Sequence, residues 1–409
     1  MKDLSYCRHE FPSLQRTGPD NLPLVFLDGP GGSQVPASVI TAITNYYLNH
    51  NANTHGQYAT SRESDAVILA ARTAMAAMLG AEDPSCISFG QNMTTLNFFL
   101  SQAIGRTLNP GDEIIVTELD HDANVAPWLE LEERGVIIKH VPVLPSAELD
   151  LDAFRALISD RTRVIAVGWA SNAVGTVNPL VQIAEWAHEA QALLVVDAVH
   201  WAPHGLIDVS PLKPDALLCS AYKFFGPHVG VLYTRPGLLA TLPTLRVRPQ
   251  MPEAPERIET GTLNHAALEG VVAAVDFIAA FADDPDESLR TRIRQAMAHV
   301  YHYEHELASK LYRGLGAIPD VRVWGPPVGA QDRAPTISFT VRDRSSIEVA
   351  HALGERGILA WDGDFYAVTL VDRLGLRAQG GLVRLGLAPY NTRVEIERTL
   401  NTIEDIVTP

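Results

Sequence analysis

Short runs rich in β-branched residues alternate with stretches of helical spacing through the first 235 residues, and this alternation restricts the possible folds more than any other feature. Strands are expected at residues 86–91, 112–119, 135–143, 163–171, 193–199, 215–222 and 229–234. Helical spacing occupies residues 94–105, 152–160 and 180–191. The order strand, helix, strand predicts an α/β protein whose large sheet is doubly wound and mostly parallel. Ligands of such sheets bind beyond the carboxyl ends of the strands, so a site is expected in the loops there.

The chain has 409 residues, which is more than one hydrophobic core usually serves. After residue 265 the pattern changes to two long helical stretches, interrupted near Pro285, and then to a shorter mixture of strands and helices. We therefore expect three parts: an N-terminal segment, residues 1–20, that packs on the small domain; a large domain, residues 21–265, that carries the sheet and the ligand site; and a connector helix with a small α+β domain, residues 266–409.

The charge balance is acidic, with 48 acidic and 32 basic residues, a formal net charge of −16 and no block of lysine and arginine. Nucleic acids and anionic membranes are therefore not expected as partners. No run approaches the ~18 apolar residues of a membrane-spanning helix, and the N-terminus lacks the apolar core of a signal peptide, which predicts a cytoplasmic protein. The three cysteines are far apart, so neither a disulfide framework nor a metal site is expected.

Two charged residues stand at the ends of strands that should be buried. Asp197 ends the apolar run "LLVVD", and Lys223 follows "DALLCSAY". Burial of either charge is costly without a partner. A pyridoxal cofactor offers a partner to each, because its ring nitrogen can pair with a carboxylate and its aldehyde can react with an amine. The sequence thus predicts pyridoxal 5'-phosphate as cofactor; the alternative is an ordinary surface Asp and Lys.

Other polar residues in the strand-end loops fit the same ligand. Asn92, Met93 and Thr94 stand where a strand turns into a helix, so free backbone N–H groups and a hydroxyl can face a phosphate. A helix cap is the commoner role of a threonine such as Thr94. Ser220 and His200 lie on the same rim and could reach the phosphate and a ring oxygen, respectively.

Two further loop residues could contact the cofactor ring. His121 follows another strand, and an imidazole there can stack on an aromatic ring and exchange protons. Asn172 ends the strand before the one that carries Asp197, and its amide could donate to a phenolic oxygen. The ordinary alternatives are a plain loop histidine and a turn residue ahead of Gly175.

Taken in order, these residues resemble the class V aminotransferase family, specifically its cysteine desulfurase and selenocysteine lyase group. Nine motifs across nearly the whole chain carry the likeness: "LDGPGGSQVPASVI", "NANTHG", "GQNMTT", "ELDHDANVAPW", "SNAVGTVNP", "VDAVHWAPH", "CSAYKFFGP", "RIETGTLN" and "VRLGLAPYNT". One such motif would be weak, but nine in the family's order and spacing are specific. The resemblance implies fold type I of the pyridoxal phosphate enzymes, an amino-acid substrate, and a homodimer with composite active sites.

The resemblance also implies roles for individual residues. Lys223 matches the lysine that binds the cofactor covalently, Asp197 the partner of the ring nitrogen, and His121 the histidine that stacks on the ring. The other matching cofactor-binding positions are Asn92, Met93, Thr94, Asn172, His200, Ser220, Gly261 and Thr262. The last two belong to a segment that, in the family, reaches the phosphate from the neighbouring subunit.

For the substrate, Arg384 matches the arginine that holds the α-carboxylate in a bidentate fork. His55, Trp361 and Tyr366 also fall at substrate-binding positions. Tyr366 stands about where the desulfurases carry the cysteine that attacks the substrate sulfur, and Trp361 stands for an expected arginine. No cysteine follows Cys219.

Five residues bear further on these departures from the family. Tyr222 replaces the family's histidine before the lysine, and His200 replaces its glutamine. Cys219 and Cys86 are expected to be small buried hydrophobes, and Cys7 is expected in an exposed N-terminal segment.

The departures leave three function classes open. The first is a carbon–sulfur or carbon–selenium lyase on a cysteine-like amino acid, since elimination from Cβ needs no cysteine nucleophile. The second is an amino-acid epimerase or aminotransferase, with Tyr366 or His121 as a second acid; an aromatic packing role is the alternative for Tyr366. The third is a non-catalytic binding or scaffold protein. This third class and a true cysteine desulfurase are less expected than the first two classes.

Overall fold

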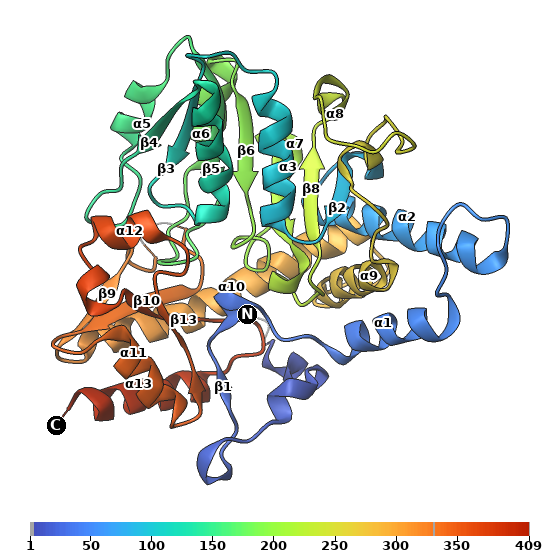
Figure 1. Ribbon diagram of the computed structural model, residues 1–409. Coiled ribbons are helices and arrows are strands. Elements are labelled where there is room, and N and C mark those ends of the chain that lie inside the picture. The colour runs from blue at the N-terminus through green and yellow to red at the C-terminus, as the bar shows by residue number, and fades with distance from the viewer. Residues whose placement is uncertain (1–3, 330–331, 409) are drawn as a thin grey trace.

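A computed structural model describes residues 4–329 and 332–408 (Figure 1). Its large sheet has seven strands in the order β2-β8-β7-β6-β5-β3-β4. Their bounds are β2 (Ile87–Gly90), β3 (Glu113–Thr117), β4 (Ile137–Val141), β5 (Thr162–Gly168), β6 (Leu193–Asp197), β7 (Ala216–Ser220) and β8 (Gly230–Thr234). Within this sheet, β8 runs antiparallel to both neighbours and the remaining pairs are parallel. The prediction of an α/β protein with a mostly parallel sheet is confirmed.

Helices cover both faces of this sheet because successive strand residues point to opposite sides. Val195 and Leu218 join one apolar cluster, which includes α3 (Met93–Gly105) and α4 (Ala126–Leu129). Val196 and Leu217 join the other, which extends through the rest of the molecule. Helices that contribute to this second cluster include α2 (Ala59–Leu79), α5 (Leu151–Leu157), α6 (Leu180–Glu189), α7 (Val209–Leu212) and α9 (His265–Ala279). The short helix α8 (Leu238–Thr241) adds two leucines to the first cluster, and α1 (Ala37–Asn49) packs on α9.

A smaller antiparallel sheet has the order β12-β13-β10-β9. Its strands are β9 (Val321–Trp324), β10 (Thr336–Val341), β12 (Trp361–Gly363) and β13 (Leu382–Gly386). The helices of this part are α10 (Leu289–Ala317), α11 (Ser346–Gly354), α12 (Val368–Arg373) and α13 (Arg393–Val407). In Figure 1, α10 passes beneath the carboxyl ends of the large sheet toward the small one. The gap between α9 and α10 contains Pro285, as the sequence predicts.

The N-terminal region contacts the C-terminal part of the chain. Nη1 of Arg8 donates to the carbonyl of Tyr390 at 3.0 Å and pairs with Glu395 at 2.8 Å. Further along, β1 (Val25–Phe26) pairs in parallel with β11 (Ile358–Leu359). The domain boundaries at residues 20 and 265 stay predictions. Among the helices of the described ranges, none combines the length and the apolar character needed to cross a bilayer.

Candidate active site

Nine of the predicted site residues line one cavity at the carboxyl ends of the large sheet. They are Asn92, Met93, Thr94, His121, Asn172, Asp197, His200, Ser220 and Lys223. The sheet topology explains why these residues lie together. Strand β6 ends at Asp197, β7 ends at Ser220, and a 3-10 turn (Ala221–Lys223) follows β7 directly. Parallel neighbours such as β6 and β7 deliver their last residues to the same edge.

The amine of Lys223 is held in low-dielectric surroundings. Its Nζ donates to the carbonyl of Pro30 and lies 4.9 Å from the ring centre of Tyr222. Burial, and then the positive charge of Arg384, lower the pKa of Lys223 to about 7, against the opposing effect of Asp197. A substantial fraction of neutral amine therefore exists near neutral pH, and a neutral amine is what both nucleophilic attack and proton abstraction require.

Asp197 is buried at the end of β6, and its Oδ1 accepts the N–H of Val199 at 2.9 Å. Burial raises the pKa of Asp197 to about 6, while the bond to Val199 and the charge of Lys223 act in the opposite direction. A cation placed against this carboxylate would favour its ionised form and lower the pKa again.

Asp120 is a second buried carboxylate in the same cavity, and the sequence reasoning missed it. Its Oδ2 accepts the N–H of Gly168 and the side-chain N–H of Asn124, both at 2.8 Å. Burial, together with the charge of Asp197, raises the pKa of Asp120 to about 7, against the opposing effect of the hydrogen bond from Asn124. The available signal was its position after β3 and directly before His121, two features that the sequence shows.

The start of α3 faces the cavity with backbone N–H groups. Asn92 caps this helix by accepting the N–H of Thr95 at 2.9 Å, so the cap is Asn92 and not Thr94. The hydroxyl of Ser220 accepts the N–H of Met93 at 3.0 Å. Thr94 is exposed toward the cavity. A helix start with a neighbouring hydroxyl is a suitable place for a phosphate.

His200 links the two sheets beneath the cavity. Its Nε2 lies 2.9 Å from Oγ1 of Thr336 on β10, and its ring meets that of His204 edge to face, with centroids 5.4 Å apart. His204 in turn bonds Glu304 of α10 at 2.8 Å. Burial, followed by the charges of His204 and Lys223, lowers the pKa of His200, which is therefore neutral at neutral pH.

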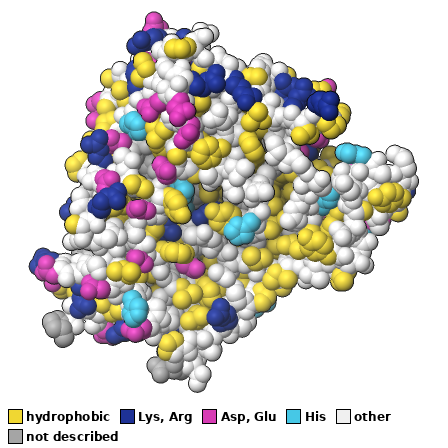
Figure 2. Space-filling view, viewed as in Figure 1, with side chains coloured by type: hydrophobic (Ala, Val, Ile, Leu, Met, Phe, Trp, Pro, Cys, Tyr) yellow, Lys and Arg dark blue, Asp and Glu magenta, His cyan; other side chains and the backbone are white. Residues whose placement is uncertain are grey.

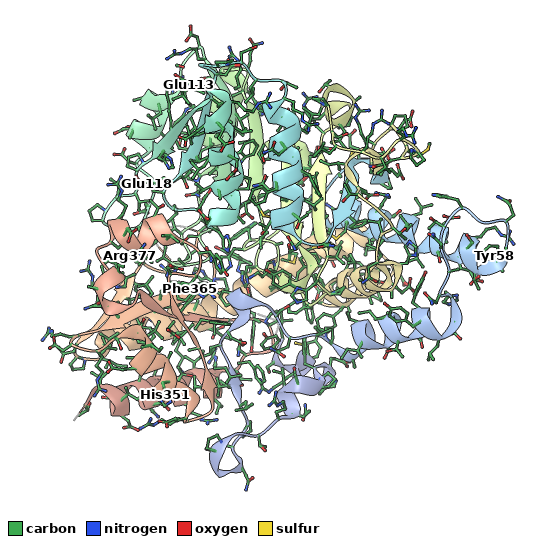
Figure 3. All side chains as sticks on the ribbon, viewed as in Figure 1. Tyr58, Glu113, Glu118, His351, Phe365 and Arg377 are labelled. Atoms are coloured by element: carbon green, nitrogen blue, oxygen red, sulfur yellow. The ribbon has the colours of Figure 1, made fainter. Side chains whose placement is uncertain are left out.

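A larger cleft of about 600 Å³ opens beside the cavity and shares its residues His121, Asn172, Tyr222 and Lys223. Arg384, Trp361 and Tyr366 line this cleft, and their assignment as substrate-binding residues stays a prediction. The guanidinium of Arg384 lies 4.0 Å from the ring centre of Phe365, and its Nη1 donates to the carbonyl of Asn172 at 3.0 Å. Figure 3 shows Phe365 between the large sheet and the small one.

Tyr366 stacks on His121, with ring centroids 5.2 Å apart and an angle of 17° between the planes. Burial, then the charges of Lys223 and Arg384, lower the pKa of His121 to about 4. The imidazole is thus neutral at neutral pH, and its Nδ1 accepts the N–H of Ala123 at 3.0 Å.

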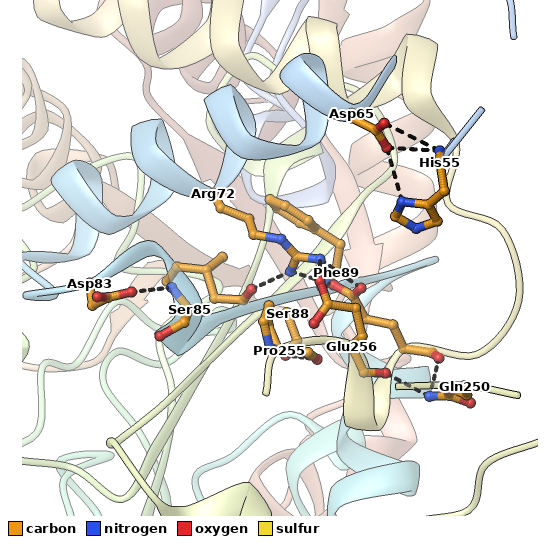
Figure 4. A network of polar contacts seen from close by, with 12 residues as sticks. His55, Asp65, Arg72, Asp83, Ser85, Ser88, Phe89, Gln250, Pro255 and Glu256 are labelled. Carbon is orange, nitrogen blue, oxygen red and sulfur yellow. Dashed lines mark hydrogen bonds and ion pairs between the residues drawn. The ribbon is translucent and has the colours of Figure 1, made fainter. Parts of the chain in front are cut away.

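His55, Gly261 and Thr262 do not join the cavity or the cleft within the described part of one chain. Figure 4 shows the imidazole of His55 beside Asp65, with 3.3 Å between Nδ1 and the carboxylate, and its side chain is 85% exposed. Gly261 and Thr262 are also exposed. They follow Glu259, whose buried carboxylate accepts two hydrogen bonds from Arg72 of α2, at 2.8 and 2.9 Å.

All three cysteines are buried, which confirms the expectation for Cys86 and Cys219 and shows that the expectation for Cys7 was wrong. Cys7 is 1% exposed because the 3-10 helix that carries it (Ser5–Glu10) packs its apolar face into the core beside Phe11. Burial raises the pKa of Cys86 and of Cys219, so both thiols resist ionisation. No cysteine is among the described residues that line the cavity or the cleft.

Comparison with known proteins agrees with this geometry. Residues 25–399 match the family described as aminotransferase class-V. The chain is 31% identical to a probable cysteine desulfurase of Vibrio cholerae, over 100% of this chain and 99% of that one. It is 30% identical to a cysteine desulfurase of Cronobacter sakazakii, over 97% and 96% of the two chains.

Solved structures of cysteine desulfurases also resemble this chain in fold. The apo cysteine desulfurase of Thermococcus onnurineus superposes with a TM-score of 0.88 at 25% identity, over 100% of this chain and 98% of that one. The cysteine desulfurase CsdA of Escherichia coli gives 0.84 at 27% identity, over the full length of both chains. The chain belongs to the class V aminotransferase family, in its cysteine desulfurase-like group, whose members are enzymes that use pyridoxal 5'-phosphate.

Proposed function

We propose that this protein is a pyridoxal phosphate-dependent carbon–sulfur (or carbon–selenium) lyase that acts on a cysteine-like amino acid. The observation that carries the proposal is the substrate cleft itself. Its loop presents Tyr366 where the resemblance expects a cysteine, and each of the three cysteines is buried elsewhere. Persulfide formation on the protein requires a reachable thiolate, whereas elimination from Cβ does not.

The residues of the cavity fit the cofactor. Oδ1 of Asn172 and Nε of Arg384 are buried and have no hydrogen-bond partner among the described residues, which is costly unless a ligand supplies one. Lys223 would bind the cofactor covalently, Asp197 would face its ring nitrogen, and His121 would stack on its ring. The phosphate would lie at the start of α3 among Asn92, Met93, Thr94 and Ser220, and the ring oxygen near Asn172 and His200. When bound, the cofactor accepts the electron pair left on the substrate Cα.

The chain's own residues then perform the remaining steps. Arg384 binds the α-carboxylate of the substrate, with the face of Phe365 packed against its guanidinium. Lys223 takes the proton from Cα, since its lowered pKa of about 7 makes it a base near neutral pH. The bond between Cβ and sulfur breaks, and the proton held by Lys223 can pass to the leaving sulfur. With one water, the substrate gives a thiol, pyruvate and ammonium, so atoms and charge balance.

The proposal includes a homodimer with composite sites. His55, Gly261 and Thr262 are exposed in one chain and would complete the site of the neighbour. Three large apolar side chains of α1 are exposed: Ile40, Tyr47 and Leu48. Figure 2 shows hydrophobic side chains gathered on the part of the surface that α1 occupies. Mixing a Lys223→Ala chain with a Thr262→Asp chain tests this, because the mixed dimer would regain one intact site and with it activity that neither parent has.

The direct test of the reaction is product analysis. Holoenzyme incubated with S-methyl-L-cysteine should release methanethiol, pyruvate and ammonium in equal amounts, and the Lys223→Ala variant should release none. Alanine as the main product from L-cysteine would instead identify a desulfurase. Lys223→Ala should keep the melting temperature of the apoprotein within a few degrees, since the lysine is not part of the apolar core.

Epimerisation is the second candidate, and the stacking of Tyr366 on His121 favours it. Inversion at Cα requires a second acid opposite Lys223, and Tyr366 lines the cleft with that lysine. In deuterium oxide, an epimerase would convert an L-amino acid without a β leaving group into its deuterated D-isomer. A lyase would instead exchange the α-proton of that amino acid for deuterium and leave the configuration at Cα unchanged.

A further inference from the structure

The cleft above Lys223 has an aromatic wall made of Trp361 and Tyr366. Trp361 is 49% exposed and Tyr366 is 69% exposed, and both line the cleft together with Arg384. Large apolar side chains that remain open to a concave site are candidate contacts for a ligand. A volume of about 600 Å³ is within the range of sites for drug-sized ligands and far larger than a cysteine side chain needs.

The backbone holds Tyr366 in place. Phe365 and Tyr366 both have left-handed conformations, with φ of 56° and 60°, which is uncommon for residues other than glycine. Hydrogen bonds maintain this turn: the N–H of Asp122 donates to the carbonyl of Tyr366 at 2.8 Å, and the N–H of Tyr366 donates to Oδ1 of Asp364 at 2.9 Å. Consecutive strained residues of this kind are concentrated at functional sites.

Trp361 is also fixed, by a glycine that leaves room for it. A Cβ on Gly31 would lie 2.5 Å from Nε1 of the indole, so the ring rests directly on this backbone. Gly31 follows Pro30, whose carbonyl accepts the hydrogen bond from Lys223. The indole therefore stands beside the reactive end of the cleft and not only at its mouth.

The charges along the cleft argue against a negatively charged distal group. Besides Lys223 and Arg384, the described residues that line it include one cation, Arg377. Arg377 is already paired with Asp372 through two hydrogen bonds, one of them 2.7 Å long. Asp362 and Asp364 line the same cleft and would repel an anion.

We propose that the cleft selects substrates whose β-sulfur carries a bulky, uncharged aromatic or heteroaromatic group, such as an S-aryl cysteine, over cysteine itself. The inference rests on the proposed lyase function for its reaction, but the binding preference belongs to the cleft alone. Arg384 holds the carboxylate, and the aryl group lies against Trp361 and Tyr366, where ring contacts add to the burial of apolar area.

Binding of deaminated analogues tests the preference without any reaction, because they lack the amine that would react with the cofactor. Calorimetry on the holoenzyme should show 3-(phenylthio)propanoate binding at least about tenfold more tightly than 3-(methylthio)propanoate, since burial of a ring contributes on that order. The 4-carboxyphenyl analogue should bind more weakly than the phenyl one. Trp361→Ala and Tyr366→Ala should each bring the phenyl-to-methyl ratio close to one, and Val368→Ala, an exposed neighbour outside the cleft lining, should keep it.

The outcomes separate the two proposals. Equal binding of the phenyl and methyl analogues by the wild-type holoenzyme would overturn the inference and leave the lyase proposal standing. A ratio that survives both aromatic substitutions would overturn it as well. Preferential binding of the phenyl analogue, with S-phenyl-L-cysteine releasing no thiophenol, would support the inference about the cleft and reject the lyase reaction.

Discussion

Asn172 donates a hydrogen bond from its Nδ2 to the backbone carbonyl of Phe365, with 2.9 Å between the two atoms. This bond joins the loop after β5 of the large sheet to the loop after β12 that carries Tyr366. Arg384 adds a second link by donating to the carbonyl of Asn172. One residue therefore connects the wall of the cavity around Asp197 with the wall of the cleft that Arg384 lines.

Removal of this bond should loosen the loop. In Asn172→Ala, amide hydrogen exchange of a peptide covering residues 361–370 should accelerate roughly fivefold, which corresponds to about 1 kcal/mol for one hydrogen bond. The matched control is Asn49→Ala, because that amide donates to the carbonyl of Asn45 within α1, at 3.1 Å. Identical exchange in Asn172→Ala and wild type would show that the loop is held by its other contacts alone.

The pH dependence of cofactor attachment follows from Lys223. Its folded-state pKa of about 7 lies below the ordinary 10.5, so the reactive neutral amine appears as the pH rises through 7. Mixing apoprotein with pyridoxal phosphate and trapping the adduct with borohydride should give a rate that rises from about pH 6 to about pH 8 and then levels off. Arg384→Gln removes a nearby positive charge and should move the midpoint upward. A wild-type rate still rising steeply above about pH 9 would contradict this pKa.

The sequence predicted the large sheet because each of its strands is a short apolar run between turn signals. Nine residues named from the sequence line one cavity, because strand ends at one edge of a parallel sheet converge; the roles assigned to them stay predictions. What the sequence could not predict were contacts between distant segments. The hydrogen bond from Asn172 to Phe365 joins residues 193 positions apart, and the sequence around neither residue predicts it.

Two other features could not be predicted from the sequence for the same reason. Trp361 lies on Gly31 although more than 300 residues separate them in the sequence. Cys7 belongs to a 3-10 helix that is too short for its apolar residues to form a recognisable periodic pattern. Its burial against the core was therefore not predicted. Chain ends are exposed by default, and here packing of the N-terminal segment overrides that expectation.

Asp197 should be required for proton chemistry at Cα. Asp197→Ala should weaken cofactor binding and slow exchange of the substrate α-proton by about a hundredfold or more, because a neutral pyridine is a poor electron acceptor. Nuclear magnetic resonance in deuterium oxide measures the exchange. The control is Asp152→Ala, an exposed aspartate in the first turn of α5. Exchange at the wild-type rate in Asp197→Ala would refute the role given to this carboxylate.

Arg384 should act on the substrate more than on the cofactor. Arg384→Lys replaces a planar fork with a point charge, which should raise KM by about tenfold or more while cofactor affinity changes little. Steady-state kinetics and cofactor titration measure the two effects separately. Arg377→Lys, on the same cleft but already paired with Asp372, serves as the comparison. Dominant loss of cofactor in Arg384→Lys would mean that Arg384 does not hold the carboxylate.

Elimination without a cysteine nucleophile can be tested in a chain that has no cysteine. A Cys7→Ala, Cys86→Ala, Cys219→Ala variant, or the three single variants if the triple one melts too early, is given S-methyl-L-cysteine, and thiol and pyruvate are measured together. The variant should keep most of the wild-type turnover and release one pyruvate for each thiol, and the intact mass of the wild-type protein after turnover should show no persulfide. Loss of activity in the folded variant, with alanine as the wild-type product from L-cysteine, would contradict it and identify a desulfurase that uses a displaced cysteine.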